Sequence, residues 1–147
     1  MSELDRARDM LAMADKDLNA LKGMLDPKVF ATEVFGFHAQ QAIEKALKAW
    51  VVLLGSDYRL THNIITLLDQ VADSGGDADS FWGLAKYNAF AVQFRYEEFG
   101  QSTEEFDRPT VVCEASRLVE HVRSLLAESE AVRGGDSSGG TDNENEV

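Results

Sequence analysis

The sequence predicts an all-α protein, and two observations support this fold class. Apolar residues recur three and four positions apart through most of the chain, which is the spacing of one face of an α-helix. Strand-like alternation of apolar and polar residues is missing, as are Asn-Gly hairpin turns. We expect an antiparallel four-helix up-and-down bundle with an additional short helix, followed by a disordered acidic C-terminal tail.

The first helix is expected to run from about Ser2 to Leu25. It opens with "SELD", in which Ser2 has a capping hydroxyl and Asp5 occupies the third helical position of a capping box. An apolar stripe marks the face of this helix that is expected to be buried in the core. The stripe consists of Leu4, Met10 or Leu11, Leu18, Leu21 and Leu25.

The second helix is expected to begin at Pro27 and to end at Gly55, after the apolar run "WVVLLG". At about 100° per residue, one of its sides is apolar and is assigned to the core. That side carries Phe35, Ala39, Ala42, Ile43, Ala46, Trp50 and Leu53. The opposite side carries four polar residues, with apolar residues at both ends of the stripe. The polar residues are His38, Gln41, Lys45 and Lys48, and the apolar ones are Phe30, Val34 and Val52.

Three further helices are expected in the second half of the bundle. A short third helix covers "HNIITLLDQVAD", residues 62–73, and an aromatic-rich fourth helix covers "FWGLAKYNAFAVQFRYEEF", residues 81–99. The segment "SGGDADS" between them is a loop by composition. A fifth helix is expected from about Pro109 to Ala127.

One domain is expected, a helical bundle at residues 1–128, followed by a tail at residues 129–147. The length of 147 residues is that of a single domain. The tail, "SEAVRGGDSSGGTDNENEV", has almost no apolar residues and an excess of acidic ones. It cannot offset the entropic cost of ordering, and we expect it to be disordered.

Composition excludes several classes of function. The formal net charge of −12 argues against broad nonspecific binding of DNA or RNA, but it leaves room for a local basic pocket. Cys113 is the only cysteine, which excludes an intrachain disulfide and a cysteine-based zinc site; we expect its thiol to be buried. Histidines and carboxylates do not have metal-ligand spacing on any one helix face, so no metal or cofactor is expected.

The expected location is the cytoplasm, without membrane association. No apolar run approaches the roughly 18 residues of a membrane span. The first residues, "MSELDRARDM", carry charges of both signs before any apolar run begins, which is not the pattern of a signal peptide.

The polar side of the second helix has two interpretations. It is a solvated face on which Glu44 and Lys48 form an i, i+4 pair, or the helix is covered on both sides. In the second case, His38, Gln41 and Lys45 line a polar cleft or a subunit contact. Lysine suits either role, because its aliphatic stem packs while its ammonium group reaches water or an anion.

Two other segments contain candidate site residues. In "RLTHNI", Thr61, His62 and Asn63 precede the third helix, where helix capping explains Thr61 or Asn63 and backbone amides can also bind an anion. In "FRYEEF", Arg95 shares a mostly apolar helical face. A guanidinium on such a face needs a partner, which is either a structural carboxylate or carbonyl, or a phosphate ligand.

The chain resembles the HEPN domain family (higher eukaryotes and prokaryotes nucleotide-binding). The resemblance rests on three motifs in order, "FHAQQAIEKALKAW", "RLTHNIITLLDQV" and "FRYEEF", followed by a last amphipathic helix. It covers about Leu4 to Leu126. The resemblance implies an antiparallel bundle of four or five helices and commonly a homodimer.

Family resemblance also implies two kinds of activity. Many members work beside a minimal nucleotidyltransferase, often as a toxin-antitoxin pair. Others are metal-independent ribonucleases that use an arginine and a histidine a few positions later. This chain departs from the ribonuclease pattern, because "YEEFGQSTEEFDR" after Arg95 contains acidic residues and no histidine.

The preferred function is therefore binding of a nucleotide or other phosphate-bearing ligand, or of a nucleotidyltransferase partner. The residues expected to form the site are His38, Gln41, Lys45, Lys48, His62, Asn63 and Arg95. None of them is assigned a catalytic role. One alternative is a metal-independent endoribonuclease toxin that uses Arg95 with a non-standard histidine. Another is a homodimer interface to which Phe30, Val34 and Val52 contribute the buried area.

Overall fold

All regular elements in the described part of the chain are helices. The computed structural model describes residues 2–88 and 107–146, with residues 134–146 as backbone only. The elements are α1 (Glu3–Lys22), α2 (Thr32–Leu53), α3 (Ile64–Asp73), the 3₁₀ helix η1 (Asp79–Asn88) and α5 (Arg108–Glu146). The all-α prediction is confirmed.

Helix α1 begins with the expected capping box. The hydroxyl of Ser2 accepts a hydrogen bond from the backbone N–H of Asp5 at 3.1 Å, and the Asp5 carboxylate accepts from the N–H of Ser2 at 3.3 Å. The helix ends at Lys22, with Gly23 as its C-cap, so it is three residues shorter than expected. Leu18 and Leu21 are buried, whereas Leu25 lies beyond the helix and is exposed.

Helix α2 begins at Thr32, five residues later than expected. Residues 27–29 form a turn instead, in which the Asp26 side chain accepts from the N–H of Lys28 at 2.9 Å. The backbone carbonyl of Asp26 accepts from the N–H of Phe30 at 3.0 Å. The expectation that Pro27 starts the helix is wrong because these local hydrogen bonds hold the chain in a turn.

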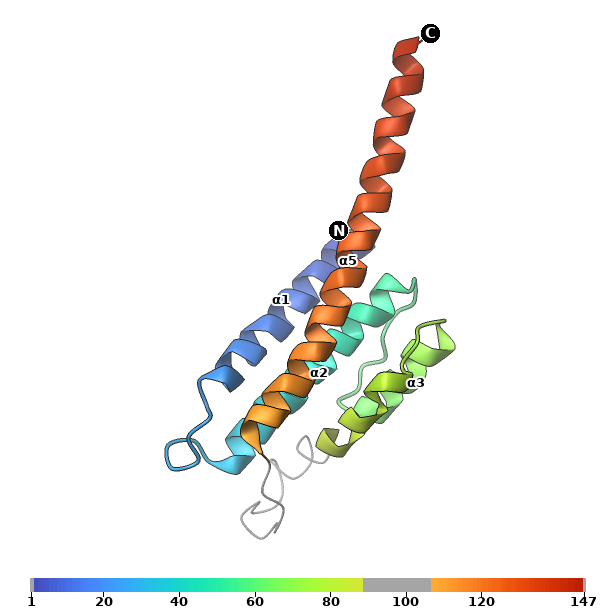
Figure 1. Ribbon diagram of the computed structural model, residues 1–147. Coiled ribbons are helices and arrows are strands. Elements are labelled where there is room, and N and C mark those ends of the chain that lie inside the picture. Colours follow the sequence, from blue (N-terminus) through green and yellow to red (C-terminus); the bar gives the residue numbers. More distant parts are fainter. Residues whose placement is uncertain (1, 89–106, 147) are drawn as a thin grey trace.

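Helix α2 is the central element of the fold (Figure 1). Along its length α1 packs antiparallel to it, while α5 runs in the same direction as α2. The predicted core side of α2 is buried except for Leu53, which is only partly buried. Because buried residues also occur on its other sides, α2 is enclosed by neighbouring segments.

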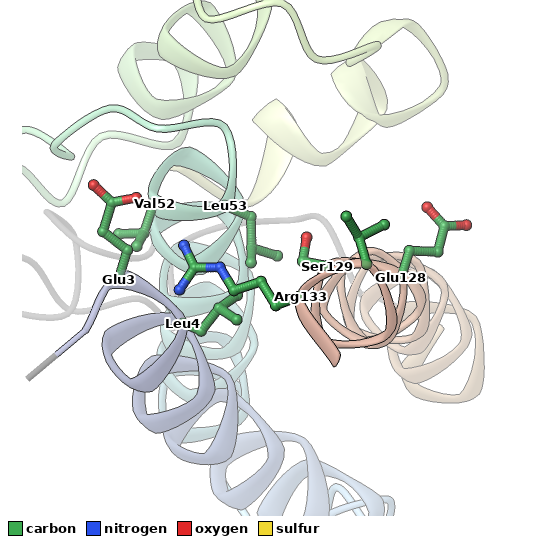
Figure 2. A pocket seen from close by; sticks show the side chains of 8 residues that line it. Glu3, Leu4, Val52, Leu53, Glu128, Ser129 and Arg133 are labelled. Atoms are coloured by element: carbon green, nitrogen blue, oxygen red, sulfur yellow. The ribbon is translucent and has the colours of Figure 1, made fainter. Parts of the chain in front are cut away.

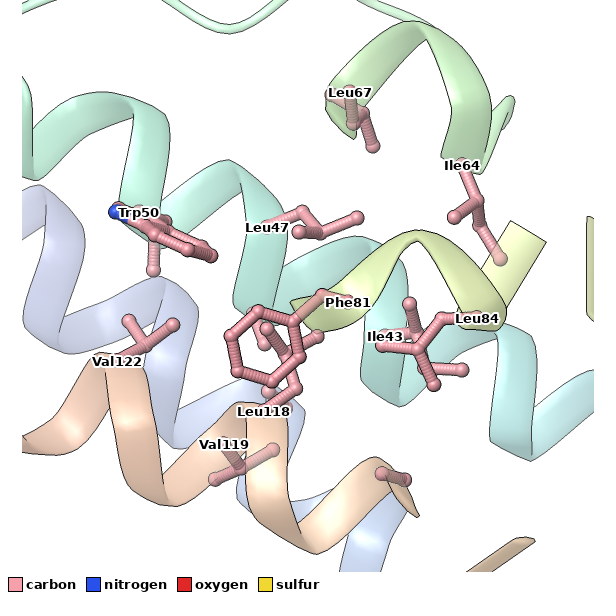
Figure 3. Packing of buried hydrophobic residues seen from close by; sticks show 14 of the residues in the cluster. Ile43, Leu47, Trp50, Ile64, Leu67, Phe81, Leu84, Leu118, Val119 and Val122 are labelled. Carbon is pink, nitrogen blue, oxygen red and sulfur yellow. The ribbon is translucent and has the colours of Figure 1, made fainter. Parts of the chain in front are cut away.

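The hydrophobic core joins α2 to α3, η1 and α5 (Figure 3). Trp50 lies at this junction, with its ring centroid 5.7 Å from that of Phe81 and 4.9 Å from that of His121. His121 is therefore a packing residue in an aromatic cluster. The other members shown in Figure 3 include Ile43, Leu47, Ile64, Leu67, Leu84, Leu118, Val119 and Val122.

The expected fourth helix is only partly described. Its first residues, Phe81 to Asn88, belong to the 3₁₀ helix η1 rather than to an α-helix. Residues 89–99, including "FRYEEF", lie outside the described residues. The antiparallel four-helix arrangement therefore stays a prediction.

Helix α5 continues beyond the expected boundary of the bundle at residue 128. Arg8 on α1 contacts Glu130 at 3.0 Å, so α5 still packs on α1 after the point where the tail was expected to begin. The backbone is helical to Glu146 (Figure 1), and disorder of the final residues stays a prediction. Cys113 on α5 is exposed, contrary to the expectation of a buried thiol. None of the helices within the described ranges is both long and apolar enough to cross a membrane.

Gly76 offers a test of the packing around Trp50. A Cβ atom at Gly76 would lie 2.7 Å from Cγ1 of Val71 and 2.9 Å from Cδ1 of Leu54. We expect Gly76→Ala to lower the free energy of unfolding by roughly 1–3 kcal/mol, as overpacking does, in urea denaturation. The matched control is Gly83→Ala, because a Cβ there meets no atom within 4 Å. A control as destabilised as Gly76→Ala would contradict this packing.

Candidate functional site

The segment between α2 and α3, residues 55–63, runs back along α2. Near its start, the Tyr58 ring lies under Lys48, with Nζ 5.3 Å from the ring centroid. Near its end, the backbone carbonyl of His62 accepts a hydrogen bond from Nε2 of Gln40 at 2.9 Å. This connecting segment therefore covers part of the polar side of α2.

The connecting segment is held in place by further hydrogen bonds. Gln70 on α3 donates to the carbonyl of Asp57 at 2.7 Å and accepts from the N–H of Arg59 at 3.0 Å. Arg6 on α1 pairs with Asp57 at 3.2 Å. The backbone of the connecting segment is thus fixed from both α1 and α3, which gives the side chains of this segment defined positions.

Glu44 is the centre of a buried polar cluster, and its side chain is only 3% exposed. Its carboxylate accepts from Nζ of Lys48 at 2.7 Å and from Nε2 of Gln40 at 2.8 Å. It also accepts from Nδ1 of His62 at 3.0 Å and from Nε2 of Gln41 at 3.3 Å. Four donors satisfy this one buried carboxylate. We call these five residues the Glu44 cluster.

The hydrogen bonds of the Glu44 cluster determine the charge of its carboxylate. Burial acts to raise the pKa of Glu44, but hydrogen bonds from Lys48, Gln40 and His62 outweigh it. The pKa of Glu44 therefore lies below its ordinary value, and the group is a carboxylate at neutral pH.

A second cluster lies between α1 and α2. Asp17 on α1 accepts from Nζ of Lys45 at 2.6 Å and contacts Nδ1 of His38 at 3.1 Å. The Asp17 side chain is mostly buried, at 13% exposed. This Asp17 cluster packs α1 against the same polar side of α2 that the connecting segment covers.

Both histidines are oriented by a carboxylate. An ionised carboxylate only accepts hydrogen bonds, so the nitrogen that faces it carries a proton. Nδ1 is that nitrogen in His62 and in His38, and a neutral ring then keeps its lone pair on Nε2. The His62 side chain is 56% exposed, so its ring is open to solvent. It is the better positioned of the two to accept a proton or a hydrogen bond from a ligand.

The charges of the two clusters balance. Glu44 and Asp17 contribute two negative charges, while Lys48 and Lys45 contribute two positive charges, with the histidines counted as neutral. Each lysine is within 2.7 Å of a carboxylate oxygen. A phosphate ligand would have to compete with these carboxylates, so neither lysine is a free cation.

Five of the seven predicted site residues meet along α2, in the two clusters. They are His38, Gln41, Lys45, Lys48 and His62. Asn63 is instead the N-cap of α3, where its side chain accepts from the N–H of Ile65 at 2.9 Å and from that of Thr66 at 3.3 Å. The capping explanation of Asn63 is confirmed. Arg95 lies outside the described residues.

The sequence reasoning missed Gln40 and Asp17. Gln40 precedes Glu44 by one helical turn, a spacing that signals the contact between them, but the apolar neighbours of Gln40 hid its role. Asp17 has no such signal, because its contacts are with another helix. The Glu44–Lys48 pair was expected and is present, but its burial shows that this is not a plain solvated face.

Two described pockets lie away from the clusters. One of 380 Å³ lies between the start of α1, the end of α2 and α5 (Figure 2), and Val52 lines it beside Leu4 and Arg133. Because Val52 is already buried within one chain, it cannot add area to a dimer interface as expected. A second pocket, of 280 Å³, lies at the opposite end of the bundle and includes Phe35 and Arg108.

A family model for the HEPN domain matches residues 7–132, which is most of the chain. The chain belongs to the HEPN domain family. The resemblance inferred from the three motifs is confirmed, and membership supports a function related to nucleotides or RNA. Comparisons with curated proteins and with solved structures give no significant match. Both polar clusters of this HEPN domain lie within the matched range.

Glu44→Gln tests the electrostatic role of the buried carboxylate. The folded-state pKa lies below the ordinary 4.5, so ionisation of Glu44 stabilises the fold above that pH. The contribution is lost as the pH falls through the lowered pKa. We expect the substitution to cost about 2 kcal/mol of unfolding free energy at neutral pH. The difference from the unmodified chain should shrink below pH 4.5 in urea denaturation.

Glu120→Gln is the matched control. Glu120 also pairs with a cation, Arg123, but its side chain is 65% exposed. Loss of the Glu120 charge should change the unfolding free energy by no more than about 1 kcal/mol. Equal effects at Glu44 and Glu120, or a Glu44 effect that grows on acidification, would contradict the assigned role.

Proposed function

We propose that this HEPN domain binds a nucleotide or another phosphate-bearing ligand along the polar side of α2. The observation that carries the proposal is the Glu44 cluster, in which a buried carboxylate orients side chains next to an exposed histidine. A buried carboxylate whose donors all have defined positions holds the neighbouring polar side chains in place, which is what a ligand site requires. In this proposal the cluster orients the ligand through hydrogen bonds.

The charge balance supports placing the phosphate on a further residue. Lys45 and Lys48 are each engaged by a carboxylate, so they contribute little net positive charge. Arg95 is the remaining cation of the proposed site. Its guanidinium has the two-pronged geometry that matches phosphate oxygens. We therefore assign the phosphate to Arg95 and the polar contacts of the ligand to His62, Gln41 and His38.

The cellular context that fits this site is a two-component system. A minimal nucleotidyltransferase protein, as in toxin-antitoxin pairs of this family, would share the nucleotide with the HEPN domain. A homodimer is the proposed form of the chain. Membership in the HEPN family supports both proposals.

A second candidate function is metal-independent endoribonuclease activity. The orientation of His62 favours it, because Nδ1 faces Glu44 and leaves Nε2 as a proton acceptor on an exposed ring. A ribose 2′-hydroxyl could transfer its proton to that nitrogen while Arg95 stabilises charge on the phosphate. His62 would then supply the histidine that is missing after Arg95.

Binding is tested by calorimetric titration with ATP and with a short single-stranded RNA. We expect saturable binding that Arg95→Ala weakens at least about tenfold, the usual cost of losing a charged hydrogen bond. Arg117→Ala is the matched control, because Arg117 is an exposed arginine on α5. Failure of the unmodified chain to bind either ligand would refute the binding proposal, and so would equal losses in the two variants.

Cleavage is tested on the same RNA in a gel assay. His62→Asn keeps a donor toward Glu44 but removes Nε2, so under the second candidate it should abolish cleavage. His38→Asn makes the same change at the other carboxylate-bound histidine; it removes a ligand contact but not the base, so cleavage should persist at a reduced rate. Intact RNA with the unmodified chain, or cleavage that persists in His62→Asn, would reject His62 as the base.

A further inference from the structure

The second pocket lies at the end of the bundle where α2 and α5 both begin (Figure 1). Its volume is 280 Å³, and its walls are polar and apolar in about equal parts. The lining residues are Leu25, Pro27, Thr32, Phe35, Asp107, Arg108 and Pro109. None of them belongs to the Glu44 or Asp17 cluster, so this pocket is independent of the proposed function.

Arg108 is a buried cation in the wall of this pocket, with only 7% of its surface exposed. Its Nη1 donates to the backbone carbonyl of Met24 at 2.8 Å, and its guanidinium lies 4.9 Å from the centroid of the Phe35 ring. Within the described part of the chain, it forms no ion pair with a carboxylate. A guanidinium has five N–H donors, and the contact with Met24 uses one of them.

A buried charge without a counter-ion is unfavourable. Buried charges in proteins are normally paired with an opposite charge, because removing them from water costs several kcal/mol. The neighbouring Asp107 forms no ion pair with Arg108, since the Asp107 carboxylate accepts from the N–H and hydroxyl of Thr110 instead. Among the described residues no carboxylate is paired with Arg108, so its remaining N–H donors are available to an anion in the pocket.

The start of α2 adds an independent requirement at the same pocket. Its N-cap residue is Ala31, which makes no side-chain capping hydrogen bond. The first N–H groups of a helix need acceptors, and the positive end of the helix dipole favours an anion. Thr32, the first residue of α2, lines the pocket. An anion in the pocket would satisfy both the uncapped helix and Arg108.

The walls indicate what kind of anion fits. Leu25, Pro27 and Phe35 offer apolar contacts to the rest of a ligand, and the pocket volume suits a small molecule. Asp107 at the same pocket disfavours a doubly charged group. A carboxylate carries a single charge and matches the two-pronged guanidinium.

We propose that the pocket between α2 and α5 binds a small organic carboxylate, with the carboxylate on Arg108 and the uncapped start of α2. The apolar part of the ligand then packs on Phe35 and Leu25. This site is distinct from the polar side of α2 and does not require Arg95.

Benzoate is the probe ligand. Its binding to the full chain is measured by protein NMR and by calorimetry. We expect saturable binding, with shifts of the Thr32 and Glu33 amides and of the Arg108 side-chain N–H signals. Benzamide, which has the same shape without the charge, should bind at least about tenfold more weakly. Inorganic phosphate should also bind more weakly than benzoate.

Arg108→Met tests the residue, because it removes the charge and keeps an apolar side chain of similar length. It should weaken benzoate at least about tenfold, whereas Arg117→Met, an exposed arginine on the same helix, should leave the affinity unchanged. Arg108→Lys keeps the charge without the two-pronged donor and should weaken benzoate severalfold. It also serves as the test variant should Arg108→Met fail to fold.

Several outcomes would overturn the proposal. Equal binding of benzoate and benzamide would show an apolar pocket without anion recognition, and tighter binding of phosphate would reject the carboxylate assignment. Undiminished benzoate binding in both Arg108 variants, or no binding by the unmodified chain, would refute the proposed carboxylate site. Each of these results leaves the ATP and RNA titrations unaffected, so the two proposals fail separately.

Discussion

The fold around α2 depends on keeping the Glu44 carboxylate satisfied. A buried ionised carboxylate is tolerated only when hydrogen-bond donors replace the water that it has lost. Here three donors come from α2 itself and one from His62, which immediately precedes the N-cap of α3. The same need therefore fixes the direction in which the chain leaves α2. Once His62 is held there, Asn63 can cap α3 and Ile64 can enter the core.

Satisfying Glu44 also explains how polar chemistry can exist on a helix enclosed by its neighbours. The polar side of α2 is covered by α1 at Asp17 and by the connecting segment at Tyr58 and His62. Each covering segment contributes either a carboxylate or a partner for one. The helix thus keeps lysines and histidines in defined positions without leaving a charge unpaired. Arg108, at the end of the bundle where α2 and α5 begin, differs from these residues because no carboxylate among the described residues pairs with it.

Local signals in the sequence predict local structure well. The Ser2 and Asp5 capping box and the Asn63 cap depend on residues two or three positions away, and both form as expected. The core side of α2 also follows directly from its periodicity. The start of α2 could not be predicted in this way, because the hydrogen bonds of Asp26 hold Pro27 in a turn.

Contacts between segments that are distant in the sequence could not be predicted from it. The side of α2 that carries His38, Gln41, Lys45 and Lys48 is visible in the sequence, but the burial of Glu44 is not. That burial depends on the connecting segment returning along α2, which no periodicity records. Asp17 is a similar case, since its partners are more than 20 residues away. Whether these residues bind a ligand depends on the side chains around them. One of the proposed site residues, Arg95, lies outside the described residues.

Trp50 joins three parts of the fold, since its ring contacts Phe81 of η1 and His121 of α5 while its backbone belongs to α2. Its indole is almost fully buried, whereas Trp82, the second tryptophan, is only partly buried. The chain therefore contains an intrinsic fluorophore at the point where α2, η1 and α5 meet. Separation of any one of these elements would bring water to that indole and shift its emission to longer wavelength, so the assembly of the core can be followed without an added label.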